Sequence, residues 1–132
     1  MIKKTITYKT YDGETVTGTY YFNLNKRDQM KLQVEHPGGL LDYLNKIIKA
    51  EDMKSIFEVI EEVVQLSYGV KSADGVHHVK NAKVLEDFVS TEAYSELVYE
   101  LATNAEAAAE FVNGIVPVEG DNDDKVPASV GA

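Results

Sequence analysis

The spacing of apolar residues changes along this chain of 132 residues, and this change constrains the fold more than any other feature. In residues 2–24 apolar side chains recur at every second position, which is typical of a β-strand with one buried face. From residue 40 onward they recur at every third or fourth position, which is typical of amphipathic α-helices. The pattern therefore predicts an α+β fold, with an N-terminal antiparallel β-hairpin followed by a mostly α-helical bundle.

The predicted hairpin occupies residues 1–24. Asp12-Gly13 separates its two runs, and both residues tolerate the positive φ that a tight hairpin turn requires. The apolar side chains of the runs fall on even positions: Ile2, Ile6, Tyr8, Val16, Tyr20, Phe22 and Leu24. A two-stranded ribbon is only marginally stable alone, so we expect its apolar face to pack on the helices or its edges to pair with another subunit.

Residues that commonly cap helix N-termini precede the apolar repeats of the helical region. We expect helices to begin after Asn25, Asp52, Asn81 and Thr91, and a last one after Thr103 or Asn104. Pro37-Gly38-Gly39 interrupts the chain before a further helix that starts near Leu40, and Gly69 is predicted to cap the helix that follows Asp52. Residues 70–80 are compatible with either a small hairpin or an ordered loop.

The composition changes after Pro117, where apolar periodicity ends. Residues 117–132 contain four acids (Glu119, Asp121, Asp123 and Asp124) and one base, Lys125. Such a segment buries too little apolar surface to order itself, so we predict a disordered acidic C-terminal tail. The predicted organisation is thus a hairpin at 1–24, a helical domain packed on it at 25–116, and the tail at 117–132.

The charge balance argues against several classes of partner. The formal net charge is −9, and nucleic acids and anionic membranes both attract clustered lysine and arginine. We therefore expect no nucleic acid and no membrane as partners, whereas a basic protein remains compatible. The chain contains no cysteine, no apolar run long enough to span a bilayer and no pattern of a signal peptide, so we expect it to stay in the cell that makes it.

The sequence contains no recognisable arrangement of catalytic or metal-binding residues. His77 and His78 are adjacent, so in an extended segment they point to opposite faces, and we assign them, with His36, structural or solvated roles. The serines have no histidine at a diagnostic spacing. We therefore expect no enzymatic activity, no catalytic residues, no metal and no cofactor.

Residues 91–115 contain no candidate catalytic pair or ligand cluster, but their acidic residues recur at regular spacing. Glu92, Glu96 and Glu100 recur every four residues along the first of two predicted helices. They form either a solvated face or an acidic stripe that binds lysine or arginine of a partner. With Tyr94 and Tyr99 beside them, these five residues are our predicted partner-binding face.

Three blocks of this sequence resemble a known family. They are YYFNLNK (Tyr20–Lys26), LSYGVKSADGVHHVK (Leu66–Lys80) and TEAYSELVYELATNAEAAAEFVNGIVP (Thr91–Pro117). In this order, and over roughly residues 4–117, the chain resembles the tail assembly chaperones of long-tailed, siphovirus-type phages of Gram-positive hosts. The blocks contain no catalytic signature and identify no binding residue.

The resemblance implies a non-enzymatic protein that binds the tape measure protein and recruits the major tail protein while the tail tube assembles. It implies action in the host cell cytoplasm and absence from the mature virion. It also implies that many copies bind one tape measure protein, which is a very long and mostly helical rod. These copies could associate as a homo-oligomer. The sequence leaves open a structural virion component, such as a tail tube, head-completion or decoration subunit. An acidic protein that mimics nucleic acid fits less well, because lysines are mixed among the acids.

Overall fold

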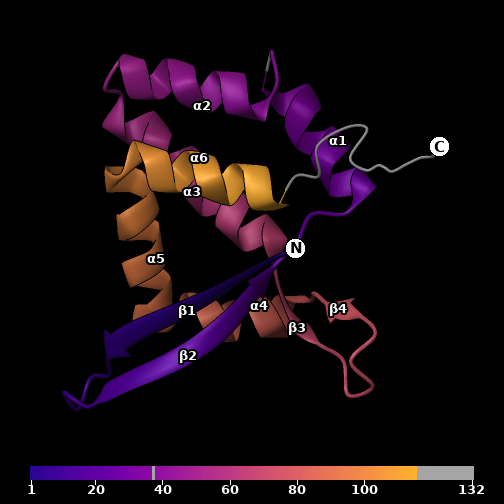
Figure 1. Ribbon diagram of the computed structural model, residues 1–132, viewed down its shortest axis with the longest axis vertical. Coiled ribbons are helices and arrows are strands. Elements are labelled where there is room, and N and C mark those ends of the chain that lie inside the picture. Colours follow the sequence, from indigo (N-terminus) through magenta and orange to yellow (C-terminus); the bar gives the residue numbers. More distant parts are fainter. Residues whose placement is uncertain (37, 116–132) are drawn as a thin grey trace.

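The computed structural model describes residues 1–36 and 38–115. In this part of the chain, a four-stranded antiparallel sheet packs against helices (Figure 1). The elements are β1 (Ile2–Lys9), β2 (Thr15–Phe22), α1 (Lys26–Glu35), α2 (Leu40–Lys49), α3 (Met53–Ser67), β3 (Tyr68–Lys71), β4 (His78–Val79), α4 (Ala82–Val89), α5 (Glu92–Thr103) and α6 (Ala105–Ile115). The predicted α+β class, with its N-terminal hairpin and helices, is confirmed. The predicted tail at 117–132 lies outside the described residues.

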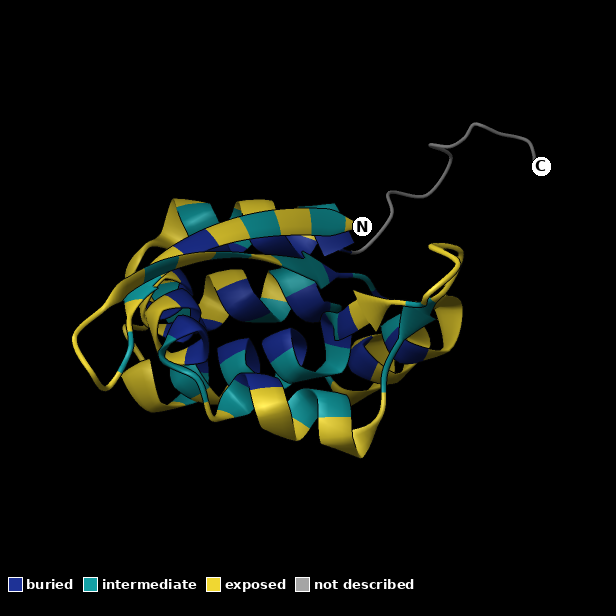
Figure 2. Ribbon diagram, turned by 90° about the horizontal axis from the view of Figure 1, so that it is seen from below, coloured by how far each residue is buried: buried dark blue, intermediate teal, exposed yellow. Residues whose placement is uncertain are grey.

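The β1–β2 hairpin has the predicted register and alternation. Ile2 pairs with Phe22 and Lys9 with Thr15, and the turn between the strands includes Gly13, at φ 86°. Side chains at odd positions from Lys3 to Thr19 are exposed, and this alternation is visible along the strands (Figure 2). The sheet order is β1-β2-β3-β4, and β2 meets β3 only at its C-terminal end, through Tyr21 and Phe22.

The predicted helix starts are confirmed by side chains that accept backbone N–H groups. In each case the backbone N–H three residues later donates to the capping side chain. The pairs are Asp28 to Asn25 (2.8 Å), Ser55 to Asp52 (3.2 Å), Val84 to Asn81 (2.9 Å), Tyr94 to Thr91 (3.3 Å) and Ala107 to Asn104 (3.0 Å). Of the two alternatives for α6, Asn104 is therefore the cap. Each bond satisfies a backbone donor that a helix leaves without an internal partner.

The prediction for Gly69 is wrong. Helix α3 passes directly into β3 at Tyr68, and Gly69 lies in the strand rather than at a helix cap. A Cβ atom at position 69 would lie 2.6 Å from Nε2 of His78 and 2.8 Å from the carbonyl oxygen of Val79, so the absence of a side chain permits close pairing with β4. Residues 70–80, left open by the sequence, form a small hairpin.

One hydrophobic core joins the hairpin to the helices. Phe22 of β2 is fully buried, and its ring lies 5.2 Å from that of Phe111 in α6. Phe88 of α4 stacks on Tyr68, with 4.1 Å between ring centroids. Because aromatic side chains bury large apolar areas, this cluster fixes the sheet against both α4 and α6. No helix in the described residues is long and apolar enough to cross a lipid bilayer.

The first strand also contacts the last described helix. The side chain of Ile2 lies against Gly114, where an added methyl group would overlap it. Close by, the backbone N–H of Leu24 donates to the carbonyl oxygen of Ile115 over 3.4 Å. Residues at the two ends of the described chain are therefore in direct contact.

Candidate protein-binding surface

Helix α5 presents most of the predicted partner-binding face to solvent. Its opposite side is buried in the core through Ala93, Leu97, Val98 and Leu101. Glu96, Tyr99 and Glu100 are exposed, and Tyr99 keeps 65% of its surface accessible, which is unusual for a large aromatic residue. Glu92, in the first turn, is half-buried. These four residues therefore lie on one accessible side of the helix.

Tyr94 is positioned differently from the other four residues, because it lies in the core with only 6% of its surface exposed. Its hydroxyl group donates to Oε1 of Glu61 over 2.7 Å and accepts from Nε2 of Gln65 over 2.8 Å. Burial, together with the bond to Glu61, raises the pKa of Tyr94 to about 12. Its contacts join α5 to α3, so the accessible part of the predicted face is Glu92, Glu96, Tyr99 and Glu100.

The acidic face of α5 is next to the hairpin. Nζ of Lys4 in β1 lies 3.6 Å from Oε1 of Glu100, whose side chain is 49% exposed. An ion pair of this exposure is worth little to stability, because water screens it. A cationic side chain of a partner can therefore replace Lys4 at small cost.

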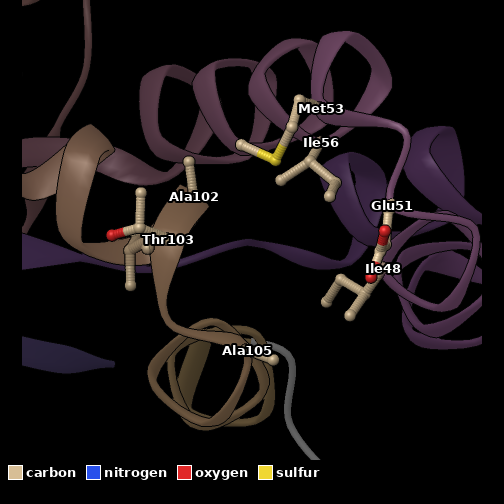
Figure 3. A pocket seen from close by; sticks show the side chains of 8 residues that line it. Ile48, Glu51, Met53, Ile56, Ala102, Thr103 and Ala105 are labelled. Atoms are coloured by element: carbon tan, nitrogen blue, oxygen red, sulfur yellow. The ribbon is translucent and has the colours of Figure 1, made fainter.

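An apolar pocket opens where the α2–α3 and α5–α6 connections meet. Its volume is about 500 Å³, and it is lined by Ile48, Glu51, Met53, Ile56, Leu101, Ala102, Thr103 and Ala105. In Figure 3 the side chains of Ile48, Met53 and Ile56 line one side, and Ala102, Thr103 and Ala105 lie across from them. Met53 is 45% exposed, so apolar surface here is available to an apolar group of a partner.

Glu51 is at the pocket in a conformation that is rare for its residue type. Its φ is 55°, and it is the residue other than glycine with positive φ in the described part of the chain. The N–H of Glu51 bonds to Ile48 and that of Asp52 to Ile47, which is the pattern that ends a helix with a left-handed residue. Glycine is favoured there, and another residue type costs about 1–2 kcal/mol. Glu51 thus places a carboxylate beside the pocket at a position where glycine would be less strained.

The pocket borders the C-terminal end of the α5 face. Thr103 lines the pocket, and its Oγ1 donates to the carbonyl oxygen of Tyr99 one turn earlier. Glu96 and Glu100 precede Thr103 in sequence and lie on the same exposed side of the helix. We refer to the pocket together with Glu51, Glu96, Tyr99 and Glu100 as the acid-rimmed surface. Its apolar floor suits aliphatic or aromatic side chains, and its carboxylates suit lysine or arginine.

His77, His78 and the buried Ser67 each contact neighbouring groups of the fold. His77 is exposed, and its Nδ1 lies 3.9 Å from Asp74. His78 is half-buried, with Nε2 3.1 Å from the carbonyl oxygen of Ser67, and burial lowers its pKa. The Ser67 hydroxyl donates to the carbonyl oxygen of Val63 in its own helix. The two histidines are therefore not brought together.

The pocket could not be predicted from the sequence. Ile48 and Ile56 belong to apolar helix faces, which predicted burial but not a shared opening. The signal that was present is the short connection between Lys49 and Met53, which forces α2 and α3 to turn sharply around Glu51. That the α5–α6 turn meets this connection depends on the tertiary fold.

Comparison with known families supports the tail assembly chaperone part of the sequence resemblance. A family model described as phage tail assembly chaperone matches residues 1–125. No match was found among curated proteins, and none was found among solved structures. The family match covers nearly the whole sequence, including every strand and helix described above. The chain therefore belongs to the phage tail assembly chaperone family.

Proposed function

We propose that this chaperone binds the tape measure protein of its phage and recruits the major tail protein to it during tail tube assembly. In this proposal it is a non-enzymatic protein of the host cell cytoplasm and is absent from the finished virion. The phage is of the siphovirus type with a Gram-positive host, as the sequence resemblance suggests. The function requires adhesive surface and no bond-making step.

The observation that supports this proposal is that the apolar pocket borders the exposed acidic side of α5 at Thr103. Amphipathic helices commonly bind by placing apolar side chains into such a depression while charged residues contact its rim. The carboxylates of Glu51, Glu96 and Glu100 would complement lysine or arginine on the helix, and the net charge of −9 would accelerate its approach. The occupant we propose is therefore a basic amphipathic helix of the tape measure protein.

The size of the surface implies that many copies act on one rod. A pocket of about 500 Å³ holds a few side chains, not a long helix. We propose that successive copies, associated as a homo-oligomer, cover the tape measure protein. Each site can then bind weakly while the assembly binds tightly, because linked sites raise the effective concentration of one another. Weak individual sites also allow the tube subunits to displace the chaperone.

Co-expression tests the proposal. The tape measure protein is expressed alone, with the wild-type chaperone, and with the Glu96→Lys/Glu100→Lys variant, and its soluble fraction is measured. We expect solubility with the wild-type chaperone and aggregation with the variant. The matched control is Glu86→Lys/Asp87→Lys, which reverses two exposed charges on α4 and should retain activity. Equal solubility with both variants would remove the acid-rimmed surface from the proposal.

A second candidate function is a structural virion component, which the hairpin favours. Within the described residues β1 pairs with β2 alone, so one edge of the sheet can accept a strand from a neighbouring subunit. Mass spectrometry of purified particles separates the two candidates. A stoichiometric signal in virions would favour the structural component, and its absence from virions but presence in infected-cell lysate would favour the chaperone.

A further inference from the structure

Three potential metal ligands converge where α1 ends. Glu35 is the last residue of α1, His36 follows it, and Glu62 lies in the middle of α3. Nε2 of His36 is 3.1 Å from Oε1 of Glu62, and one ligand atom from each of the three residues lies within 4.8 Å of the others. These residues are unrelated to the acid-rimmed surface.

The imidazole is held in place by its surroundings. The side chain of His36 is only 14% exposed, and its ring stacks on Tyr43 of α2 with 4.7 Å between centroids. The ring therefore directs Nε2 toward Glu62 without needing a bound ion to orient it. Fixed orientation of a histidine reduces the entropy lost when it ligates a metal.

Neither carboxylate has a lysine or arginine partner among the described residues, and His36 is the basic side chain beside Glu62. In residues 1–36 and 38–115, no lysine or arginine nitrogen lies within 4 Å of Glu35 or Glu62. Carboxylate oxygens of Glu35 and Glu62 lie within 4.8 Å of each other, and like charges at this distance repel. A cation between them would remove this repulsion.

We propose that Glu35, His36 and Glu62 bind one divalent transition-metal ion of the zinc class and thereby join the end of α1 to α3. Zinc lies about 2.0–2.2 Å from nitrogen and oxygen ligands, so two ligands of one ion are roughly 3.3 Å apart, close to the observed His36–Glu62 distance. The exposed Glu35 side chain can rotate to complete the set. One imidazole and two carboxylates leave a fourth position for water, and this mixed donor set favours zinc-like ions over magnesium.

Calorimetric titration of the full-length chain with zinc chloride, after removal of any histidine tag, tests the proposal. We expect saturation at one zinc per chain and a zinc-dependent rise in the unfolding temperature, because a ligand that binds only the folded state stabilises it. Magnesium chloride at the same concentrations should have no such effect. Failure of the wild-type protein to bind zinc saturably would overturn the proposal and would leave His36 as a histidine paired with carboxylates.

Matched variants locate the ion. Glu35→Gln, Glu62→Gln and His36→Gln should each weaken zinc binding at least tenfold, consistent with the sensitivity of metal sites to their ligands. Glu35→Gln alters an exposed side chain, so it tests the site even if one of the other two variants fails to fold. His77→Gln, which removes the exposed histidine beside Asp74, is the control and should bind like wild type. Unchanged binding in Glu35→Gln, or an equal loss in His77→Gln, would contradict the assignment.

Discussion

Lys80 and Asp28 form an ion pair that joins two distant parts of the sequence. Nζ of Lys80 lies 3.1 Å from Oδ2 of Asp28 in the first turn of α1, and 2.9 Å from the carbonyl oxygen of Leu66 near the end of α3. The Asp28 side chain is only 8% exposed and that of Lys80 is 26% exposed. This pair therefore fixes the start of α1 against α3 and the second hairpin.

Removal of the ammonium group should destabilise the fold. We predict that Lys80→Met lowers the free energy of unfolding by about 3 kcal/mol, at the lower end of the range for breaking a buried pair, because a carboxylate is left without its cation. Urea denaturation measures the change. Lys83→Met removes the exposed Lys83–Asp87 pair and should cost less than about 0.5 kcal/mol. Equal losses of unfolding free energy for the two substitutions would show that the buried pair stabilises the fold no more than the exposed pair.

The close contact at Gly69 gives a second prediction. Gly69→Ala should destabilise the protein by about 1–3 kcal/mol, because the new methyl group meets the rigid backbone of β4 at Val79. Gly114→Ala is the comparison, and thermal unfolding measures both. There the obstacle is the flexible end of Ile2, and alanine favours the helix by up to about 1 kcal/mol. Gly69→Ala should therefore be the more destabilising of the two.

Stability should depend on pH through His78. Burial lowers the pKa of His78 below its usual value of 6.5, so below pH 6.5 the unfolded chain takes up the proton more readily than the folded one. The contribution of His78 to stability is thus present above pH 6.5 and is lost as the pH falls toward its folded-state value. Nδ1 of this ring is buried without a hydrogen-bond partner among the described residues, so protonation there is unfavourable.

Urea midpoints at pH 7.5 and pH 5 measure this dependence. We expect the difference between the two midpoints to shrink in His78→Gln, which keeps a donor for the Ser67 carbonyl oxygen, and to persist in His77→Gln, because His77 is exposed. If both variants keep the wild-type difference between the two urea midpoints, groups other than His78 cause the pH dependence.

Glu51 should show opposite effects on stability and on binding. Glu51→Gly relieves the left-handed conformation at the end of α2 and should raise the free energy of unfolding by about 1 kcal/mol. It also removes a carboxylate from the acid-rimmed surface, so co-expression should yield less soluble tape measure protein. A variant that is more stable and fully active would show that Glu51 has no part in binding.

Much of the fold could be predicted because its determinants are local. The alternation in residues 2–24 placed the hairpin, and capping residues such as Asn25 and Thr91 located helix starts, since each depends on neighbours within a few positions. The prediction for Gly69 was wrong because glycine after an apolar helix has two common roles. It can cap the helix, or it can allow a close contact between strands, and the sequence does not distinguish them. Only the pairing with β4 distinguishes the two.

The candidate sites were less predictable because they form where helices meet. The pocket requires the α2–α3 and α5–α6 connections to converge, and the Glu35–His36–Glu62 group joins residues that are 26 positions apart. Tyr94 differs from the rest of the predicted face because it is buried. It belongs to the same apolar repeat as Leu97 and Leu101, which already indicated burial, and its proximity to acidic residues in sequence gave it a place on the predicted face.

The contact between Ile2 and Gly114 has a consequence for biosynthesis. The hairpin leaves the ribosome before α5 and α6, yet its apolar face packs on both of these helices. Until residue 115 emerges, the nascent ribbon has exposed apolar side chains and unpaired edges, and a two-stranded sheet of this kind is not stable alone. The described fold can therefore close only after residue 115 has emerged, when α5 and α6 cover the apolar face of the hairpin.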